Sequence, residues 1–208
     1  MMAYPKFLSP EEIVKTAVHL VEHGQVDGLS LRAVAAELGV KAPSLYRYFS
    51  DKEALENAVA EAILNLMLVE FRKTTASKNP ETRFRKMVEV YLRFARERFT
   101  LYTFVVQHNH PERYASGMGK AVWDLIVDTA SAVSGQSDDT AAAVATWAFL
   151  HGYATLERSG AFGPSGPKGG LERGLEAFLS SFRSGVPSAR QRNAVRTAAV
   201  QHANPAAD

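Results

Sequence analysis

The sequence contains no cysteine, and this absence removes several kinds of chemistry at once. Without thiols the chain can form no disulfide bond, no thiolate metal site and no cysteine nucleophile. It also lacks an apolar stretch near the roughly 18 residues that cross a bilayer, and its first residues show no apolar run typical of a signal peptide. We therefore expect a cytoplasmic protein with no membrane partner.

The chain also has little excess charge of either sign. Its formal net charge is +2, so bulk charge does not by itself predict a polyanionic partner. A nucleic-acid interface must rest on local placement, and residues 41–52 carry Lys41, Arg47 and Lys52 against Asp51 alone. With 46% hydrophobic and 22% charged residues, the composition is typical of a folded globular protein.

Helix signals dominate the chain, and strand signals are nearly absent. Ser9 and Ser30 stand where helix N-caps are expected, Ser50 opens a further capping box, and Gly39 permits a left-handed helix end. Glycine and proline predict a flexible loop at 159–170. The spacing of apolar residues predicts helices over about 10–23, 31–38, 42–49, 51–74, 80–99, 101–108, 112–134, 138–160 and 170–184.

The two short segments on either side of Gly39 can pack together through their apolar faces. Packing leaves outward the side chains of Lys41, Ala42, Ser44, Tyr46, Arg47 and Tyr48. A short helix with donors at its exposed N-terminal end is typical of a recognition helix in the DNA major groove. We expect Tyr46, Tyr48 and Lys52 to meet phosphates, and residues 41–44 to meet base edges. A helical hairpin with tyrosines at its rim is the alternative interpretation.

The stretch GLSLRAVAAELGVKAPSLYRYFSDKEAL, residues 28–55, resembles the TetR (tetracycline-repressor) family of bacterial transcription regulators, and the similarity extends over residues 10–64. Tyr48 stands where the family often has histidine, which leaves the base preference open. By this resemblance the DNA contacts include Arg32, Ser44, Tyr46, Tyr48 and Lys52. The full set of predicted DNA-binding residues is Arg32, Lys41, Ala42, Pro43, Ser44, Tyr46, Arg47, Tyr48 and Lys52.

A second stretch, WAFLHGYATLERSGAF, begins at Trp147 and resembles the W-H-G word of one subclass of TetR-type C-terminal domains. Trp147 and His151 lie four residues apart, so they share a helix face. Aromatic residues elsewhere are suited to line an apolar pocket, although such a stripe is also typical of plain core, as is a packed tryptophan beside a hydrogen-bonded histidine. The predicted ligand-binding residues are Phe84, Met87, Tyr91, Phe94, Tyr102, Phe104, Trp123, Trp147 and His151.

These observations together predict an all-α protein. We expect an N-terminal three-helix helix-turn-helix DNA-binding domain at 1–50, a larger helical ligand-binding and dimerisation domain at 51–186, and a flexible tail at 187–208. The resemblance implies a homodimeric repressor, nucleoid-associated when DNA-bound, that an unknown small apolar or amphipathic effector releases from an inverted-repeat operator in double-stranded DNA. The expected dimer contacts are Ala142, Ala143, Ala145, Ala148, Leu175, Phe178, Leu179 and Phe182.

Two other functions fit parts of the sequence. A DNA-bound structural or partner-recruiting protein of the same fold would not respond to a ligand. His19, Glu22 and His23 form an H-x-x-E-H pattern, which in some hydrolases holds zinc. Gly24 ends that helix at once, and both histidines fall away from its apolar face, so an exposed polar surface explains them equally well. We expect no catalytic residues, no metal and no cofactor.

Overall fold

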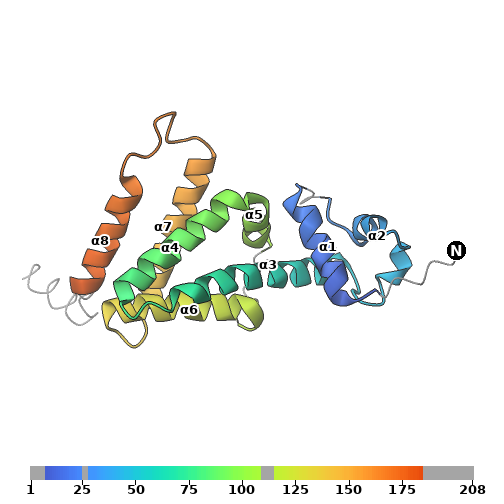
Figure 1. Ribbon diagram of the computed structural model, residues 1–208, viewed down its shortest axis with the longest axis horizontal. Coiled ribbons are helices and arrows are strands. Elements are labelled where there is room, and N and C mark those ends of the chain that lie inside the picture. The colour runs from blue at the N-terminus through green and yellow to red at the C-terminus, as the bar shows by residue number, and fades with distance from the viewer. Residues whose placement is uncertain (1–7, 25–27, 109–114, 185–208) are drawn as a thin grey trace, which may run out of the picture.

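The computed structural model describes residues 8–24, 28–108 and 115–184, and every regular element within these ranges is a helix. The molecule is elongated, with α1, α2 and η1 at one end and α4, α7 and α8 toward the other (Figure 1). The predicted all-α class is confirmed, and the tail at 187–208 lies outside the described residues. The elements are α1 Pro10–Glu22, α2 Leu31–Leu38, η1 Ala42–Ser44, α3 Lys52–Thr74, α4 Pro80–Glu97, α5 Phe99–Gln107, α6 Gly117–Ser134, α7 Thr140–Arg158 and α8 Gly170–Ser184.

The α2–η1 unit is built by local signals that the sequence carries. The Ser30 side chain accepts a hydrogen bond from the Ala33 amide at 3.1 Å and so caps α2. Gly39 ends that helix at φ 68°, a left-handed conformation that costs little only for glycine. Buried apolar residues of α2 then pack on Leu45, whose side chain is fully buried.

The predicted helix over 42–49 is wrong in form. The structure has a 3₁₀ helix at Ala42–Ser44, followed by a turn that brings the Tyr48 amide within 2.9 Å of the Leu45 carbonyl. The segment is too short to offset the cost of helix nucleation, and its aromatic residues have modest helix propensity. The result is a compact, tightly wound element rather than a regular α-helix.

Helix α3 connects the two ends of the molecule. Asp51, rather than the predicted Ser50, caps it by accepting from the Ala54 amide at 2.8 Å. It packs against α1, α4, α5 and α6, and its inward residues from Leu55 to Phe71 are buried. Midway along α3, the Glu61 carboxylate accepts a hydrogen bond from the Met118 amide at 2.7 Å, at the start of α6. The two helices are therefore joined by a polar contact as well as by packing.

The remaining helices form a bundle, and ion pairs at its surface join α4 to α7 and α8. Arg96 of α4 lies 2.6 Å from Glu157 of α7, and the Arg85 guanidinium of α4 lies 2.6 Å from Glu176 of α8. The connection between α7 and α8, predicted to be a flexible loop, is wound into hydrogen-bonded turns, such as Gly163 amide to Gly160 carbonyl at 2.9 Å. None of the helices in the described ranges is both long and apolar enough to cross a membrane.

Most of the predicted dimer contacts are already buried within one protomer. Phe178 packs on Phe149, with ring centroids 5.4 Å apart, so it serves the α7–α8 contact of its own chain. Ala145 and Ala148 of α7 remain exposed. The side chains buried within the single chain, and thus unavailable to a partner copy, are Ala142, Ala143, Leu175, Leu179 and Phe182.

Candidate DNA-binding face and ligand cavities

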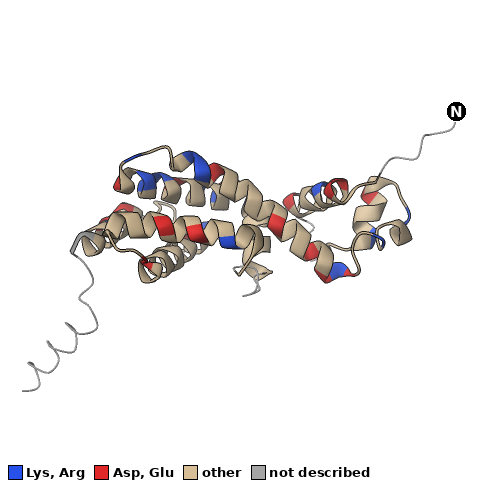
Figure 2. Ribbon diagram, turned by 90° about the horizontal axis from the view of Figure 1, so that it is seen from below, with Lys and Arg blue, Asp and Glu red and all other residues tan. Residues whose placement is uncertain are grey.

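The predicted DNA-binding residues lie on the end of the molecule formed by α2, η1 and the start of α3. Tyr46 is 52% exposed and Tyr48 is 38% exposed, which is unusual for large aromatic side chains. Both acidic and basic residues are present at this end, so the charge is mixed rather than gathered in one patch (Figure 2). The exposed members of the set are Arg32, Lys41, Pro43, Tyr46, Arg47, Tyr48 and Lys52, whereas Ala42 and Ser44 are half-buried.

The two tyrosines differ in how their hydroxyl groups are used. The Tyr48 hydroxyl donates a hydrogen bond to the Leu8 carbonyl at 2.7 Å, which ties the turn after η1 to the segment that enters α1. Its donor is therefore already engaged, and only its oxygen remains to accept a further bond. Tyr46, the more exposed of the two, is better placed to donate to a phosphate.

Lys52 stands at the first turn of α3 and belongs to a chain of polar contacts. Its ammonium lies 3.2 Å from the Glu56 carboxylate, one helical turn further along. The same carboxylate lies 3.3 Å from Nε2 of His108, at the end of α5, and the His108 ring stacks on Phe104. His108 of the bundle is thus connected through Glu56 to Lys52, the predicted DNA contact at the start of α3.

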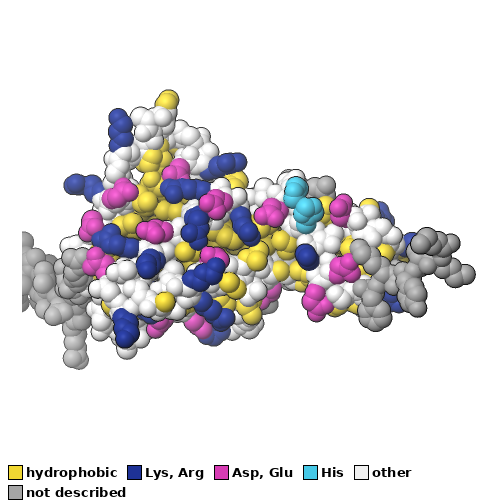
Figure 3. Space-filling model, in the orientation of Figure 1, with side chains coloured by type: hydrophobic (Ala, Val, Ile, Leu, Met, Phe, Trp, Pro, Cys, Tyr) yellow, Lys and Arg dark blue, Asp and Glu magenta, His cyan; other side chains and the backbone are white. Residues whose placement is uncertain are grey.

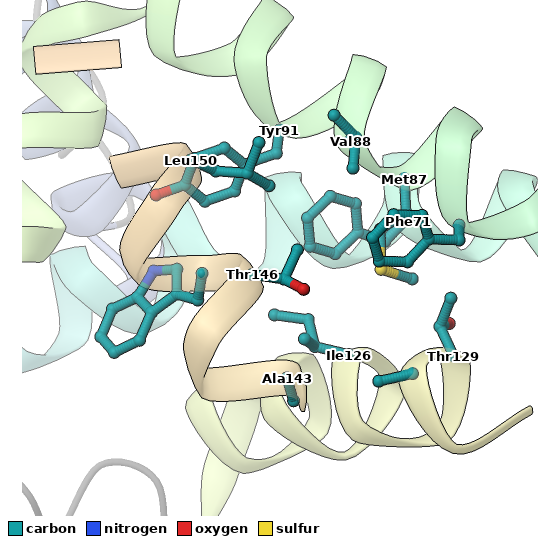
Figure 4. Close-up of a pocket in the computed structure, with 12 residues that line it drawn as sticks. Phe71, Met87, Val88, Tyr91, Ile126, Thr129, Ala143, Thr146 and Leu150 are labelled. Carbon is teal, nitrogen blue, oxygen red and sulfur yellow. The ribbon is translucent and has the colours of Figure 1, made fainter. Parts of the chain in front are cut away.

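Two small apolar cavities lie inside the bundle. The first, of about 30 Å³, lies between α3, α4, α6 and α7, as Figure 4 shows from the labelled Phe71, Met87, Ile126 and Thr146. The second, of about 50 Å³, adjoins it toward α5. Each has room for only a few water-sized guests, so a larger ligand requires the helices to move apart. Tyr91, Ile126 and Trp147 line both cavities.

The structure gathers six of the predicted ligand-binding residues around these cavities. Phe84, Met87, Tyr91 and Trp147 line the first, and Tyr102 and Trp123 join the wall of the second. The Trp123 and Trp147 rings meet edge to face, with centroids 6.2 Å apart. Three predicted residues, Phe94, Phe104 and His151, belong to neither wall.

His151 and Phe94 both lie outside the cavity walls, in different surroundings. His151 Nδ1 lies 2.5 Å from the Tyr102 hydroxyl, which in turn lies 3.1 Å from the Tyr91 hydroxyl, so the imidazole stands behind the cavity wall. Phe94 lines a surface groove between α3 and α4 together with Leu66 and Val69. Burial raises the pKa of the Tyr102 hydroxyl, while its hydrogen bond with Tyr91 acts in the opposite direction.

Sequence reasoning missed several residues of the first cavity. Phe71 and Leu150 lie among the apolar residues of long helices, where nothing in the pattern separates a cavity wall from ordinary core. Thr129 and Thr146 are buried hydroxyl residues in otherwise apolar surroundings. A threonine among apolar residues at helical spacing is the signal that could have drawn attention to this cavity.

The histidines of the H-x-x-E-H pattern are surface residues. The rings of His19 and His23 lie 4.1 Å apart, and histidine side chains are visible together at the end of α1 (Figure 3). The His23 ring is turned back toward its own helix, with Nδ1 2.8 Å from the His19 carbonyl. Within the described parts of the chain, no group of three or more His, Cys, Asp or Glu residues is arranged to hold a metal ion. The hydrolase interpretation therefore gains no support.

The all-helical chain, its capped helix-turn-helix, and the exposed tyrosines and cations beside it are the features of a helix-turn-helix DNA-binding protein. Two family models match it: "Bacterial regulatory proteins, tetR family" over residues 13–59 and "Tetracyclin repressor-like, C-terminal domain" over residues 84–182. The chain belongs to the TetR family and is a DNA-binding transcriptional regulator. The match over 84–182 includes the Trp147–Gly152 stretch.

The similar proteins are regulators or share the fold. The chain is 28% identical over 163 residues to an uncharacterized HTH-type transcriptional regulator of Mycobacterium tuberculosis, which covers 76% of this chain and 74% of that one. It is 44% identical to the class A tetracycline repressor of Escherichia coli, but over only 27% of this chain and 26% of the repressor. A Rhodococcus protein of unknown function has the same fold, with a TM-score of 0.68, 23% identity, and coverage of 86% and 98%.

Proposed function

We propose that this regulator is a homodimeric repressor, and that a small, largely apolar molecule lowers its affinity for an inverted-repeat operator. The observation that carries the proposal is the position of α3. Phe71, near one end of this helix, lines the first cavity, and Lys52, at the other end, lies on the predicted DNA-binding face. A guest that enlarges the cavity by displacing α3 would therefore also move Lys52.

The proposed reading face consists of the exposed residues of α2, η1 and the start of α3. Residues 41–44 are short or flexible enough to approach base edges, while Tyr46 and Lys52 are suited to phosphates. Two such faces in a dimer would meet successive turns of the major groove, about 34 to 36 Å apart. This spacing corresponds to an inverted-repeat operator.

Replacing Lys52 with alanine is expected to weaken binding to all DNA sequences alike. If its ammonium neutralises one phosphate, the slope of log affinity against log salt should fall by about 1 in magnitude. Fluorescence anisotropy with labelled DNA at several salt concentrations measures this slope. Lys73→Ala is the matched control, because Lys73 lies at the far end of α3 and is paired with Glu70 as Lys52 is with Glu56. Equal slopes for both variants would argue against a phosphate contact at Lys52.

The switching mechanism predicts reciprocal coupling between effector and operator. A molecule that weakens operator binding must itself bind more weakly, by the same factor, to the operator-bound protein. A typical coupling is about 1 to 3 kcal/mol. Titration of one effector into free dimer, and into dimer saturated with operator, gives both sides of the cycle. Equal effector affinities in the two titrations would rule out switching by that compound.

A non-switching DNA-bound protein of the same fold is the second candidate. The small size of both cavities favours it, because a nearly filled core does not itself require a ligand. The two functions separate in the same titration. Compounds that bind inside the bundle yet leave operator affinity unchanged would make the non-switching protein the better assignment.

A further inference from the structure

The first cavity contains one buried hydroxyl group without a partner. Thr146 is 5% exposed, and its Oγ1 makes no hydrogen bond within the described residues. Figure 4 shows this oxygen pointing from α7 into the cavity. A buried hydroxyl that forgoes its hydrogen bonds costs free energy, so a native structure seldom keeps one without a use.

Other helical threonines of this chain show what Thr146 could do instead. Thr129 Oγ1 donates to the Leu125 carbonyl at 2.8 Å, and Thr155 Oγ1 donates to the His151 carbonyl at 2.8 Å. Both bonds reach back one helical turn, the usual way in which a helix satisfies a threonine hydroxyl. Thr146 does not take this option, so its hydroxyl stays available to a guest in the cavity.

The walls of both cavities carry no charged side chain in the described part of the chain. Their polar groups are the hydroxyls of Thr129, Thr146, Tyr91 and Tyr102 and the indole groups of the two tryptophans. His151 is bonded to the Tyr102 hydroxyl and lines neither cavity, and the Arg83 guanidinium is engaged by Asp128. An ionised ligand would lose its water here without gaining a counter-ion, which is strongly unfavourable.

We propose that the effector is an uncharged, elongated apolar molecule with a hydroxyl or carbonyl group that hydrogen-bonds to Thr146 Oγ1. The elongated shape follows from the shared wall, because Tyr91, Ile126 and Trp147 separate two cavities that would become one channel if these side chains moved. This inference refines the proposed function and rests on its assumption that the bundle binds the effector. It distinguishes neutral alcohols and ketones from free fatty acids and amines.

Binding of 1-octanol to the full-length protein tests the role of Thr146. Trp123 and Trp147 report occupancy through their fluorescence, since both line the cavities. Thr146→Val keeps the shape and removes the hydroxyl, so it should weaken 1-octanol binding about two- to tenfold. Thr146→Ser keeps the hydroxyl and should remain within about twofold of the parent. Thr155→Val is the matched control, because Thr155 lies on the same helix outside both cavity walls, is exposed, and donates its hydroxyl to the His151 carbonyl.

Binding of octanoate and octylammonium at neutral pH tests the charge requirement. Both should bind at least about tenfold more weakly than 1-octanol, because neither finds a counter-ion. The proposal is overturned if octanoate or octylammonium binds as tightly as 1-octanol, if Thr146→Val binds 1-octanol as tightly as Thr155→Val does, or if 1-octanol does not bind. None of these measurements involves DNA. If Thr146-dependent binding is found but operator affinity does not change, the ligand class stands and the repressor mechanism fails.

Discussion

The Ala148→Arg variant is expected to be monomeric and to bind its operator about a hundredfold or more weakly than the parent protein. Ala148 lies on an exposed stripe of α7 with Val144 and Leu156, which are 46% and 47% exposed. These residues recur at helical spacing, so a second copy can pack closely against this face. A long cation placed at its centre would leave an unpaired charge in the interface.

The loss of operator binding follows from the loss of one of two linked reading faces. A dimer binds its second half-site at a high effective concentration, and a monomer gives up that advantage. Sedimentation velocity measures the oligomeric state, and anisotropy measures the affinity. Ala132→Arg makes the same change at an exposed site of α6 and should leave both unchanged. If Ala148→Arg stayed dimeric, the contact between copies would have to lie on another face.

Phe104→Ala is expected to lower the free energy of unfolding by about 3 to 5 kcal/mol. The Phe104 side chain is fully buried, and its ring stacks on His108 with centroids 4.1 Å apart. Truncation removes a large apolar group and leaves a cavity that α3 and α5 can fill only in part. Denaturant unfolding followed by circular dichroism measures the change.

Two comparisons show whether Phe104 acts through the core or through the ligand. Phe99→Ala truncates a half-buried ring on the same helix and should cost less. Because Phe104 lies outside both cavity walls, folded Phe104→Ala protein should bind 1-octanol as the parent does. If Phe104→Ala lost 1-octanol binding without a large loss of stability, Phe104 would be a ligand contact, as the sequence predicts.

Local signals predicted most of the helices because a capping side chain acts on amides only a few residues away. Ser9 and Ser30 both cap the helices at whose starts they were expected. At α3 both Ser50 and Asp51 are suited to the role, and the sequence offered no way to choose between them. The form of η1 was missed because a helical pattern that short does not distinguish a 3₁₀ helix from an α-helix.

The candidate ligand site was only partly predictable, because it depends on how each helix is rotated within the bundle. Tyr91 and Phe94 lie three residues apart on α4, yet Tyr91 lines both cavities and Phe94 lines a groove with α3. The aromatic pattern alone cannot assign these two directions. Thr146 was missed because its importance comes from a hydrogen bond that it does not make, and only the structure reveals that.

The length of α3 determines how far the DNA-binding end of this helix moves when the helix tilts inside the bundle. Phe71 and Lys52 lie 19 residues apart in this helix, which corresponds to about 28 Å along its axis. A tilt of about 6° at the Phe71 end would move Lys52 by about 3 Å, and opposite tilts in two copies would change the separation of their reading faces by about 6 Å. Under the proposed mechanism, a small rotation of α3 inside the bundle is therefore enough to change how two copies fit successive turns of the major groove.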